Sequence, residues 1–323
     1  PAGHQHLSSE QITHKKAREM RTRISIIIIL LSASLYSQQD SQFTQYMYNT
    51  IGVNPAYAGS RGVMSLFGIH RQQWVGLDGA PVTTAFSAHT PLPSNTGVGL
   101  SIIKDAIGAQ DETNVAVDFS YTIHTSENVK LSFGIKGSMN MLNIDYTKLN
   151  INDPSDSRLQ TNIDKRFSPN VGAGAYLHGN KGYVGLSVPQ MIQTEHFNQG
   201  VVGGYMAKER LHYYIIGGYV FDLNESIKFK PALLNKIVMG APLQTDISAN
   251  FMINQRFVAG VAYRVSAAFS ALTGFQINDQ LFVGYSYDAE TTRLAKYNTG
   301  SHEIFLRYEL FRNHGRVISP RFF

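Results

Sequence analysis

The sequence contains no cysteine among its 323 residues, and this absence removes several functions at once. Disulfides, thiolate-bound metals and cysteine nucleophiles are excluded. Charged residues are also scarce, at 16% of the chain against roughly 25% in ordinary soluble domains. After residue 40 no apolar run reaches the roughly 20 residues that a transmembrane helix needs. Low charge without long apolar runs is typical of a transmembrane β-barrel, because only alternate residues of each strand face lipid.

What the chain does contain agrees with this interpretation. It has 28 glycines, 17 tyrosines and 18 phenylalanines. Aromatic side chains anchor a barrel at the two membrane interfaces, and glycine relieves crowding inside it. The net charge of +5 owes much to an N-terminal cluster formed by Lys15, Lys16, Arg18, Arg21 and Arg23. The charge is therefore no sign of a nucleic-acid partner, and we predict none. The barrel interpretation predicts outer-membrane lipid as a partner.

The N-terminal region has the layout of a secretory signal, with Met20 interpreted as its initiator. Arg21 and Arg23 form a basic region, Ile24 to Leu31 form a short apolar region, and small residues precede a cut near Ser37–Gln38. This segment of eight residues, seven of them apolar, is too short to cross a bilayer core of about 30 Å. Residues 1–37 are thus predicted to be an upstream stretch plus a cleaved signal peptide.

Hydrophobicity alternates with period two from Gly62 onward. In Ala116–His124, apolar residues such as Val117 and Phe119 point one way, while Asp118 and Ser120 point the other. The pattern recurs at 129–136, 257–264, 281–288 and 303–310. The second face is too polar for a sandwich core and too rich in glycine and serine for a solvated surface. It fits the lumen of a barrel.

These segments predict an all-β protein, a transmembrane antiparallel β-barrel of about 14 strands over residues 62–312, followed by a tail at 313–323. An even strand number predicts that both termini lie in the periplasm. Pro231 inside a predicted strand is irregular. The predicted strands are 62–75, 81–91, 96–107, 111–125, 127–143, 168–179, 181–190, 208–223, 226–240, 243–254, 256–266, 268–277, 280–290 and 301–312.

The connections between these strands divide into two groups. Every second connection is short and turn-forming, as expected at the periplasmic side. These begin at Pro93, Thr125, His178, Leu223, Asn254 and Asn278. The longer connections, Ile144–Phe167, Met191–Ala207 and Thr291–Gly300, all fall on the opposite side.

Signals for catalysis are weak. The sequence has no nucleophile elbow, zinc-protease motif or P-loop, and we predict neither an enzyme nor a cofactor or metal site. His70, His89, His124 and His178 are placed on strands in the lumen-facing phase and interpreted as hydrated lumen residues. Gly97, Gly99, Gly172 and Gly174 are interpreted as small lumen positions. Asn152–Asp156 with Asp164 is interpreted as a polar loop rather than a calcium site, since the EF-hand spacing is absent.

The most specific residues precede and enter the first strand. Residues 38–61 are aromatic and amide-rich with Asn-Pro and Ala-Gly breaks, which suit a periplasmic segment or a plug that packs into the lumen or onto a partner. Trp74 fits an interface girdle, and Asp78-Gly79 a tight turn at the outer end of the first hairpin. The candidate partner-binding or plug residues are Asn54, Pro55, Tyr57, Gly59, Trp74, Asp78 and Gly79.

The strings Q-F-x-Q-Y-M-x-N, N-P-A-Y-A-G-S and Q-W-V-G-x-D-G-A-P resemble the PorP/SprF family of Bacteroidetes outer-membrane proteins. The resemblance runs from about Gln42 to the C-terminus. It implies a role in type IX secretion and gliding motility, with two kinds of partner. These are periplasmic components of the secretion system and large secreted adhesins that carry a type B C-terminal sorting domain. The family supplies no catalytic residues.

Two functions outside catalysis remain open at this point. The first is a barrel in the outer membrane that anchors secreted adhesins at its long outer loops or links to the secretion machinery. The second is a diffusion channel or apolar-solute transporter, which a lumen lined by glycine, serine and charged residues permits.

Overall fold

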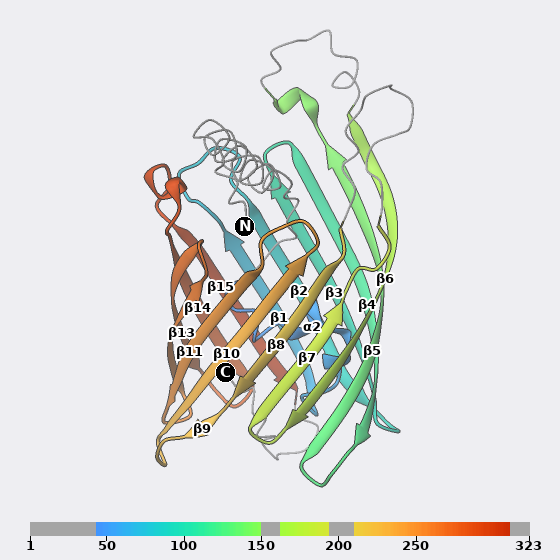
Figure 1. The fold of residues 1–323 in the computed structure, drawn as a ribbon, viewed down its shortest axis with the longest axis vertical. Coiled ribbons are helices and arrows are strands. Elements are labelled where there is room, and N and C mark those ends of the chain that lie inside the picture. Colours follow the sequence, from blue (N-terminus) through green and yellow to red (C-terminus); the bar gives the residue numbers. More distant parts are fainter. Residues whose placement is uncertain (1–42, 150–161, 194–209, 311–323) are drawn as a thin grey trace, which may run out of the picture.

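A computed structural model describes residues 43–149, 162–193 and 210–310. They form one antiparallel sheet that closes on itself, because β1 pairs with β15 and β10 pairs with β11 (Figure 1). The strands are β1 (Met64–Gln72), β2 (Val82–Leu92), β3 (Thr96–Ile107), β4 (Gln110–His124), β5 (Val129–Ile144), β6 (Ile163–Gly179), β7 (Gly182–Val188), β8 (His212–Tyr219), β9 (Phe221–Asp222), β10 (Ile227–Val238), β11 (Gln244–Ile253), β12 (Phe257–Arg264), β13 (Ala268–Gln276), β14 (Leu281–Glu290) and β15 (Ser301–Leu310).

The predicted barrel of 14 strands is confirmed once β8 and β9 are counted as one strand. Both pair with β10 in the same register, with Gly218 opposite Ala232 and Phe221 opposite Phe229. That register puts Pro231 opposite Tyr219, where the ladder is interrupted. Proline has no N–H to donate to a neighbouring strand, which explains the gap.

The two ends of the barrel differ, as the turn pattern predicts. We call them the short-turn end, where β1 begins and β15 ends, and the long-loop end. The six predicted short turns all connect strands at the short-turn end (Figure 1). At the long-loop end, the connections after β5 and β7 run through 150–161 and 194–209, so the two longest predicted loops fall largely outside the described residues.

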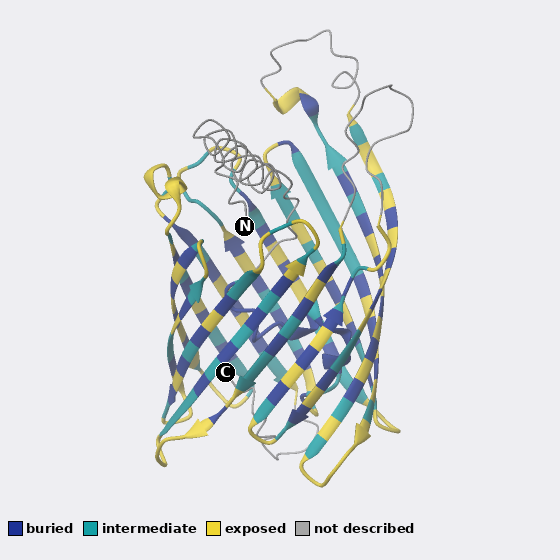
Figure 2. Cartoon of the chain, in the orientation of Figure 1, coloured by how far each residue is buried: buried dark blue, intermediate teal, exposed yellow. Residues whose placement is uncertain are grey.

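Burial follows the predicted alternation along the strands (Figure 2). On β4 and β5 the apolar residues Val117, Phe119 and Ile135 are exposed, whereas Asp118 and Lys136 are buried. The exposed apolar face is the one that meets lipid in a transmembrane barrel. Within the described residues, no helix is long and apolar enough to span a membrane.

Two strand starts differ from the prediction by more than two residues. β8 begins at His212 rather than 208, and β6 begins at Ile163 rather than 168. The pairing of β6 with β5 shifts register between Leu142 and Ile144, and Lys165 has a positive φ of 47°. This bulge breaks the period-two pattern, so the first residues of β6, at the long-loop end, do not show the alternation that predicts a strand.

The predicted phase of the histidines is wrong for His70. His89 and His178 are buried inside, and His124 shares that phase at the exposed end of β4. His70 instead faces outward, where its Nδ1 lies 2.8 Å from Thr84 Oγ1. The reason is that β1 points Phe67 and Ile69 into the barrel, so apolar residues do not mark the lipid face of this strand.

Candidate functional site: the plugged lumen

Residues Phe43–Arg61, which we call the plug, lie inside the barrel (Figure 1). They contain one turn of helix, α2 (Thr50–Val53), and a 3-10 turn, η1 (Pro55–Tyr57). The plug starts beside Asp288 and Glu303, in the long-loop half of the lumen, and ends at Glu309 near the short-turn end. The chain therefore runs down the lumen before β1 turns back up through the wall.

The Asn-Pro pair at the centre of the plug starts η1. Asn54 Oδ1 accepts a hydrogen bond from the Ala56 amide at 3.0 Å, and Pro55 occupies the first position of the turn, where its missing N–H costs nothing. The other side of the Asn54 amide donates to the Ala175 carbonyl of β6 at 3.1 Å. Asn54 thus caps a turn and binds it to the wall with one side chain.

Inward-facing glycines form a seat for this turn. A Cβ at Gly134 would overlap the backbone of Pro55 and Ala56, and one at Gly174 would overlap Asn54 Oδ1. A Cβ at Gly97 would overlap the backbone of Ala58, and one at Gly99 would overlap the side chain of Ile51. Glycine at these positions lets the plug backbone approach the wall, so the predicted role of Gly97, Gly99 and Gly174 as small lumen residues becomes a specific packing role. A Cβ at Gly172 would instead overlap the backbone of Pro189.

Gly59 and Tyr57 hold the part of the plug that lies toward the short-turn end. Gly59 has a positive φ of 70°, and its amide donates to His89 Nδ1 at 3.1 Å. Tyr57 is fully buried, with ring centroids 5.6 Å from Tyr176 and 5.3 Å from His89 in edge-on packing. Both motif residues therefore contact the inner wall rather than solvent.

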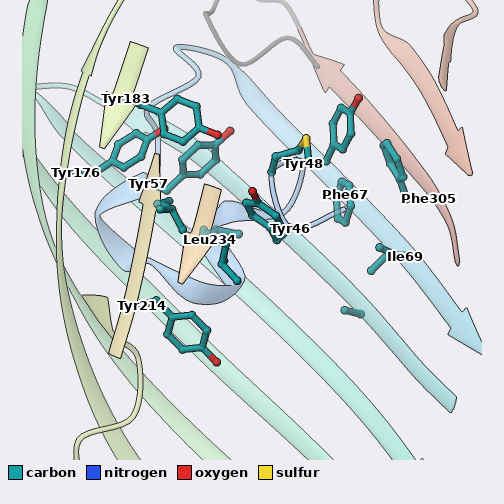
Figure 3. Close-up of a cluster of buried hydrophobic side chains, with 14 of the residues drawn as sticks. Tyr46, Tyr48, Tyr57, Phe67, Ile69, Tyr176, Tyr183, Tyr214, Leu234 and Phe305 are labelled. Carbon is teal, nitrogen blue, oxygen red and sulfur yellow. The ribbon is translucent and has the colours of Figure 1, made fainter. Parts of the chain in front are cut away.

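The plug completes an apolar cluster that reaches around the lumen (Figure 3). The Tyr48 ring lies 4.5 Å from that of Phe305 and 5.5 Å from that of Phe282. Burial raises the pKa of Tyr48, so the phenol remains neutral in this cluster. Wall residues of the cluster come from strands on all sides, including Phe67, Ile69, Tyr176, Tyr183, Tyr214, Ile216, Leu234, Met252, Val258, Phe282 and Phe305.

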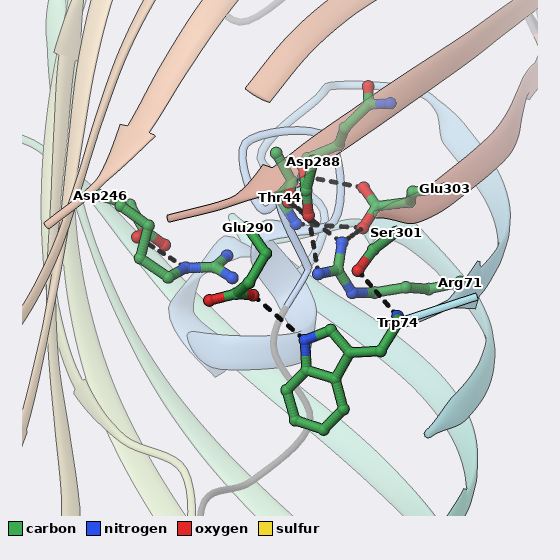
Figure 4. Close-up of polar contacts among 10 residues, drawn as sticks. Thr44, Arg71, Trp74, Asp246, Asp288, Glu290, Ser301 and Glu303 are labelled. Carbon is green, nitrogen blue, oxygen red and sulfur yellow. Dashed lines mark hydrogen bonds and ion pairs between the residues drawn. The ribbon is translucent and has the colours of Figure 1, made fainter. Parts of the chain in front are cut away.

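A buried charge network holds the upper end of the plug (Figure 4). Arg71 lies 2.7 Å from Asp288 and 3.0 Å from Glu303. The Glu303 carboxylate also accepts the backbone amides of Thr44 at 3.0 Å and Gln45 at 2.9 Å. Thr44 Oγ1 donates to Asp288 at 2.7 Å. Three strands of the wall, β1, β14 and β15, thus meet on two plug residues.

Further polar contacts follow the plug downward. Lys136 pairs with Asp118 at 3.0 Å and donates to the Ile51 carbonyl at 3.3 Å. At the lower end, Arg61 forms a buried ion pair with Glu309. Burial alone would lower the pKa of Arg61, but Glu309 and Tyr57 raise it above its usual value. These contacts satisfy charges that would be costly inside a closed lumen.

The remaining candidate residues lie at the long-loop rim, in the loop between β1 and β2. Trp74 is half-buried, and its Nε1 donates to Glu290 at 3.1 Å (Figure 4). Asp78 is exposed, and the Gly79 carbonyl accepts the Gly108 amide of the next turn at 2.9 Å. The seven candidate residues therefore separate into two groups: Asn54, Pro55, Tyr57 and Gly59 in the plug, and Trp74, Asp78 and Gly79 at the rim.

Arg71, Asp288 and Glu303 belong to the site but show no sign of a function in the sequence beyond their positions on strands. Phe282 and Phe305 lie on the polar face of their strands. A large apolar residue on a lumen-facing position is the signal that something packs there. Within the described residues no cluster of three or more histidines and acids is arranged to hold a metal. Asn152–Asp156 lies outside them.

No curated protein matches the chain. Among solved structures it is similar to the outer membrane protein Omp33 of Acinetobacter baumannii, with 9% identity, coverage of 77% of this chain and 98% of that chain, and a TM-score of 0.46. It is also similar to the monoaromatic hydrocarbon channel CymD, with 11% identity, coverage of 86% of this chain and 96% of that chain, and a TM-score of 0.48. A FadL homologue of Pseudomonas aeruginosa is similar with 11% identity, coverage of 82% of this chain and 94% of that chain, and a TM-score of 0.48. At these identities and TM-scores, the likenesses carry no conclusion about what this chain binds or transports.

The family described as type IX secretion system membrane protein PorP/SprF matches residues 35–308. The match includes the plug and nearly all of the barrel, and it confirms the resemblance carried by the N-terminal strings. This is a family of secretion-system membrane barrels rather than a known class of enzyme. The chain belongs to the PorP/SprF family of type IX secretion system membrane proteins and is a β-barrel of the outer membrane.

Proposed function

We propose that this protein is a plugged, non-enzymatic scaffold of the type IX secretion system that anchors secreted adhesins at its long-loop end. The observation that carries the proposal is the filled lumen. The plug packs into an apolar cluster with wall residues from all sides and is hydrogen-bonded along its length. A barrel filled in this way serves better as a rigid platform than as a water-filled path.

The proposed orientation has the short-turn end in the periplasm and the long-loop end outside the cell. Outer-membrane barrels have short periplasmic turns and longer outer loops. Every described connection at the short-turn end is short, and the longer described connections, 73–81 and 291–300, lie at the long-loop end. The ends of β1 and β15 at the short-turn end would then face the periplasmic components of the secretion system. The expectation of two periplasmic termini concerns residues outside the described ranges, and the plug itself starts in the long-loop half of the lumen.

The proposed partner outside the cell is an adhesin with a type B C-terminal sorting domain, and membership of a secretion-system family supports this choice. The rim around Trp74, Asp78 and Gly79 is the contact surface that we propose for it. Hydrogen bonds hold this rim in place before any partner arrives, which lowers the entropic cost of binding.

A binding assay tests the proposal. The full-length barrel in proteoliposomes is titrated with a purified type B domain, and saturable binding is expected. Asp78→Lys should weaken binding, whereas Glu127→Lys, an exposed change at the short-turn end, should not. In cells, deletion of the gene should release the adhesin into the medium. No binding, together with unchanged surface adhesin after deletion, would overturn the proposal.

Conductance separates the scaffold from the alternative of a diffusion channel. A plugged scaffold should be nearly silent in a planar bilayer, whereas a channel should give steady openings with the wild-type protein. Uptake of small apolar solutes into proteoliposomes provides a second reading for a transporter. Wild-type conduction or uptake would favour the channel.

A further inference from the structure

The loop between β14 and β15, residues Thr291–Gly300, is a rigid projection at the long-loop end. It contains the 3-10 turn η3 (Arg293–Lys296), capped by Thr292 Oγ1, which accepts the Leu294 amide at 3.3 Å. Asn298 closes the turn, donating to the Leu294 carbonyl and accepting the Gly300 amide at 2.8 Å. Its own side chains therefore fix the conformation of this loop.

The loop is also bound to its neighbours. The Val75 amide donates to the Gly300 carbonyl at 2.9 Å, and the Thr299 amide donates to the Val75 carbonyl at 2.8 Å. Tyr287 Oη donates to the Thr299 carbonyl at 2.9 Å. These contacts hold the loop against the β1–β2 loop and above the ends of β14 and β15 (Figure 1).

This rigid loop presents two cations and two apolar side chains to the outside. Arg293, Leu294, Lys296 and Tyr297 are all exposed (Figure 2), and Tyr297 is 68% exposed. Within the described chain, Arg293 and Lys296 have no acidic partner. The nearby Glu290 and Asp288 are already bound to Trp74 and Arg71.

Directly below the loop, the outward face of the same two strands carries an aromatic cluster. Tyr285 Oη lies 2.6 Å from His302 Nδ1, and the Tyr287 ring lies 5.3 Å from that of His302. Amphipathic rings on the outer surface of a barrel mark the level of the lipid headgroups. The Tyr287 hydroxyl of this cluster donates to the Thr299 carbonyl of the loop, so the cluster and the loop are in direct contact.

We infer that this surface binds the phosphate groups of lipid headgroups in the adjacent leaflet. Arg293 and Lys296 supply the positive charge, because guanidinium and ammonium groups pair with phosphate oxygens. Leu294 and Tyr297 supply the apolar contacts of an interfacial anchor. In the proposed orientation this leaflet is the outer one, and the ligand is its phosphorylated glycolipid. A lipid is favoured over a protein because the loop continues the lipid-facing aromatic cluster.

Native mass spectrometry of the full-length, delipidated barrel tests this inference. The probe is lipid A with both phosphates, compared with the same lipid after its phosphates are removed. Wild-type protein should prefer the phosphorylated form by about twenty- to thirty-fold, since each cation near an anionic lipid surface contributes roughly fivefold. This arm needs no variant and depends on no folding control.

The double variant Arg293→Gln/Lys296→Gln should lose the preference, and Lys148→Gln should retain it. Lys148 is a matched control, because it is an exposed cation in η2 (Tyr146–Lys148), another 3-10 turn at the same end. An unchanged emission of Trp74 shows that the loops remain joined. Binding that ignores the phosphates, or that survives in the double variant, would overturn the inference. So would a secreted protein that binds through Arg293 and Lys296 while lipid A does not.

Discussion

Arg71 and Glu303 face each other across the seam of the barrel, with Arg71 Nη1 3.0 Å from Glu303 Oε2 and both side chains almost fully buried. One strand of the seam contributes the cation and the other contributes the anion. The same carboxylate accepts two consecutive amides of the plug. The pair therefore connects wall closure with plug attachment.

Replacing Glu303 with alanine should destabilise the folded barrel by about 3–5 kcal/mol, because Arg71 loses a partner inside the lumen and the amides of Thr44 and Gln45 lose their acceptor. Glu303→Gln should cost less, since an amide oxygen remains to accept a hydrogen bond. Urea unfolding in lipid vesicles measures both. Glu127→Ala, in an exposed turn, is the control and should be neutral. Equal stability of the two alanine variants would show that the network does not hold the plug.

Gly134→Ala should displace the plug, because the new Cβ would overlap the backbone of Pro55 and Ala56. We expect openings in a planar bilayer and a loss of stability of about 1–3 kcal/mol, as in other overpacked interiors. Gly137→Ala on the same strand is the matched control, since a Cβ there meets nothing within 4 Å. If Gly134→Ala shows no more conductance and no less stability than Gly137→Ala, the inward-facing glycines do not position the plug.

Glu290→Ala should shift the fluorescence of Trp74 to the red, because the indole loses its hydrogen bond and becomes more exposed to water. Trp74 is the single tryptophan of the chain, so the emission reports this rim alone. The lost charged hydrogen bond should cost about 1.5–3 kcal/mol in local stability. Glu225→Ala, in an exposed turn at the other end, is the control. An unchanged spectrum would mean that Glu290 does not hold the indole.

Cysteine labelling measures the orientation directly, because the chain has no thiol of its own. Lys148→Cys at the long-loop end should react with a membrane-impermeant maleimide in intact cells. Glu127→Cys at the short-turn end should react only after the outer membrane is permeabilised. Both positions are exposed, so access rather than burial decides the result. The reverse pattern would invert the proposed orientation.

The barrel could be predicted from the sequence because its wall repeats one simple rule. Residues such as Val117 and Asp118 alternate between lipid and lumen, and each turn at the short-turn end is marked by asparagine, glycine or proline near it. The rule fails where a residue meets something other than lipid or water. Phe67 and Ile69 face inward against the plug, which reversed the phase assigned to His70.

The contacts of the plug could not be derived in the same way. Asn54, Pro55, Tyr57 and Gly59 are recognisable as local breaks in the chain, but the partners that they contact come from distant strands, including β2, β5, β6 and β7. Inward charges such as Glu303 look the same in sequence whether they are hydrated or bound to a backbone amide. Only the closed sheet brings residue 44 to residue 303.

The glycine seat and the charged seam have a consequence for biogenesis. Arg71 lies on β1 and Glu303 on β15, the first and last strands, which pair with each other to close the barrel. Both side chains need the plug or each other as a partner. A sheet that joined its edges around an empty lumen would enclose an unfilled apolar cavity and unsatisfied carboxylates, each of which is costly. Seating of the N-terminal segment and joining of the edges are thus one cooperative step, and whatever inserts this protein into the membrane must keep the sheet open until that segment is inside.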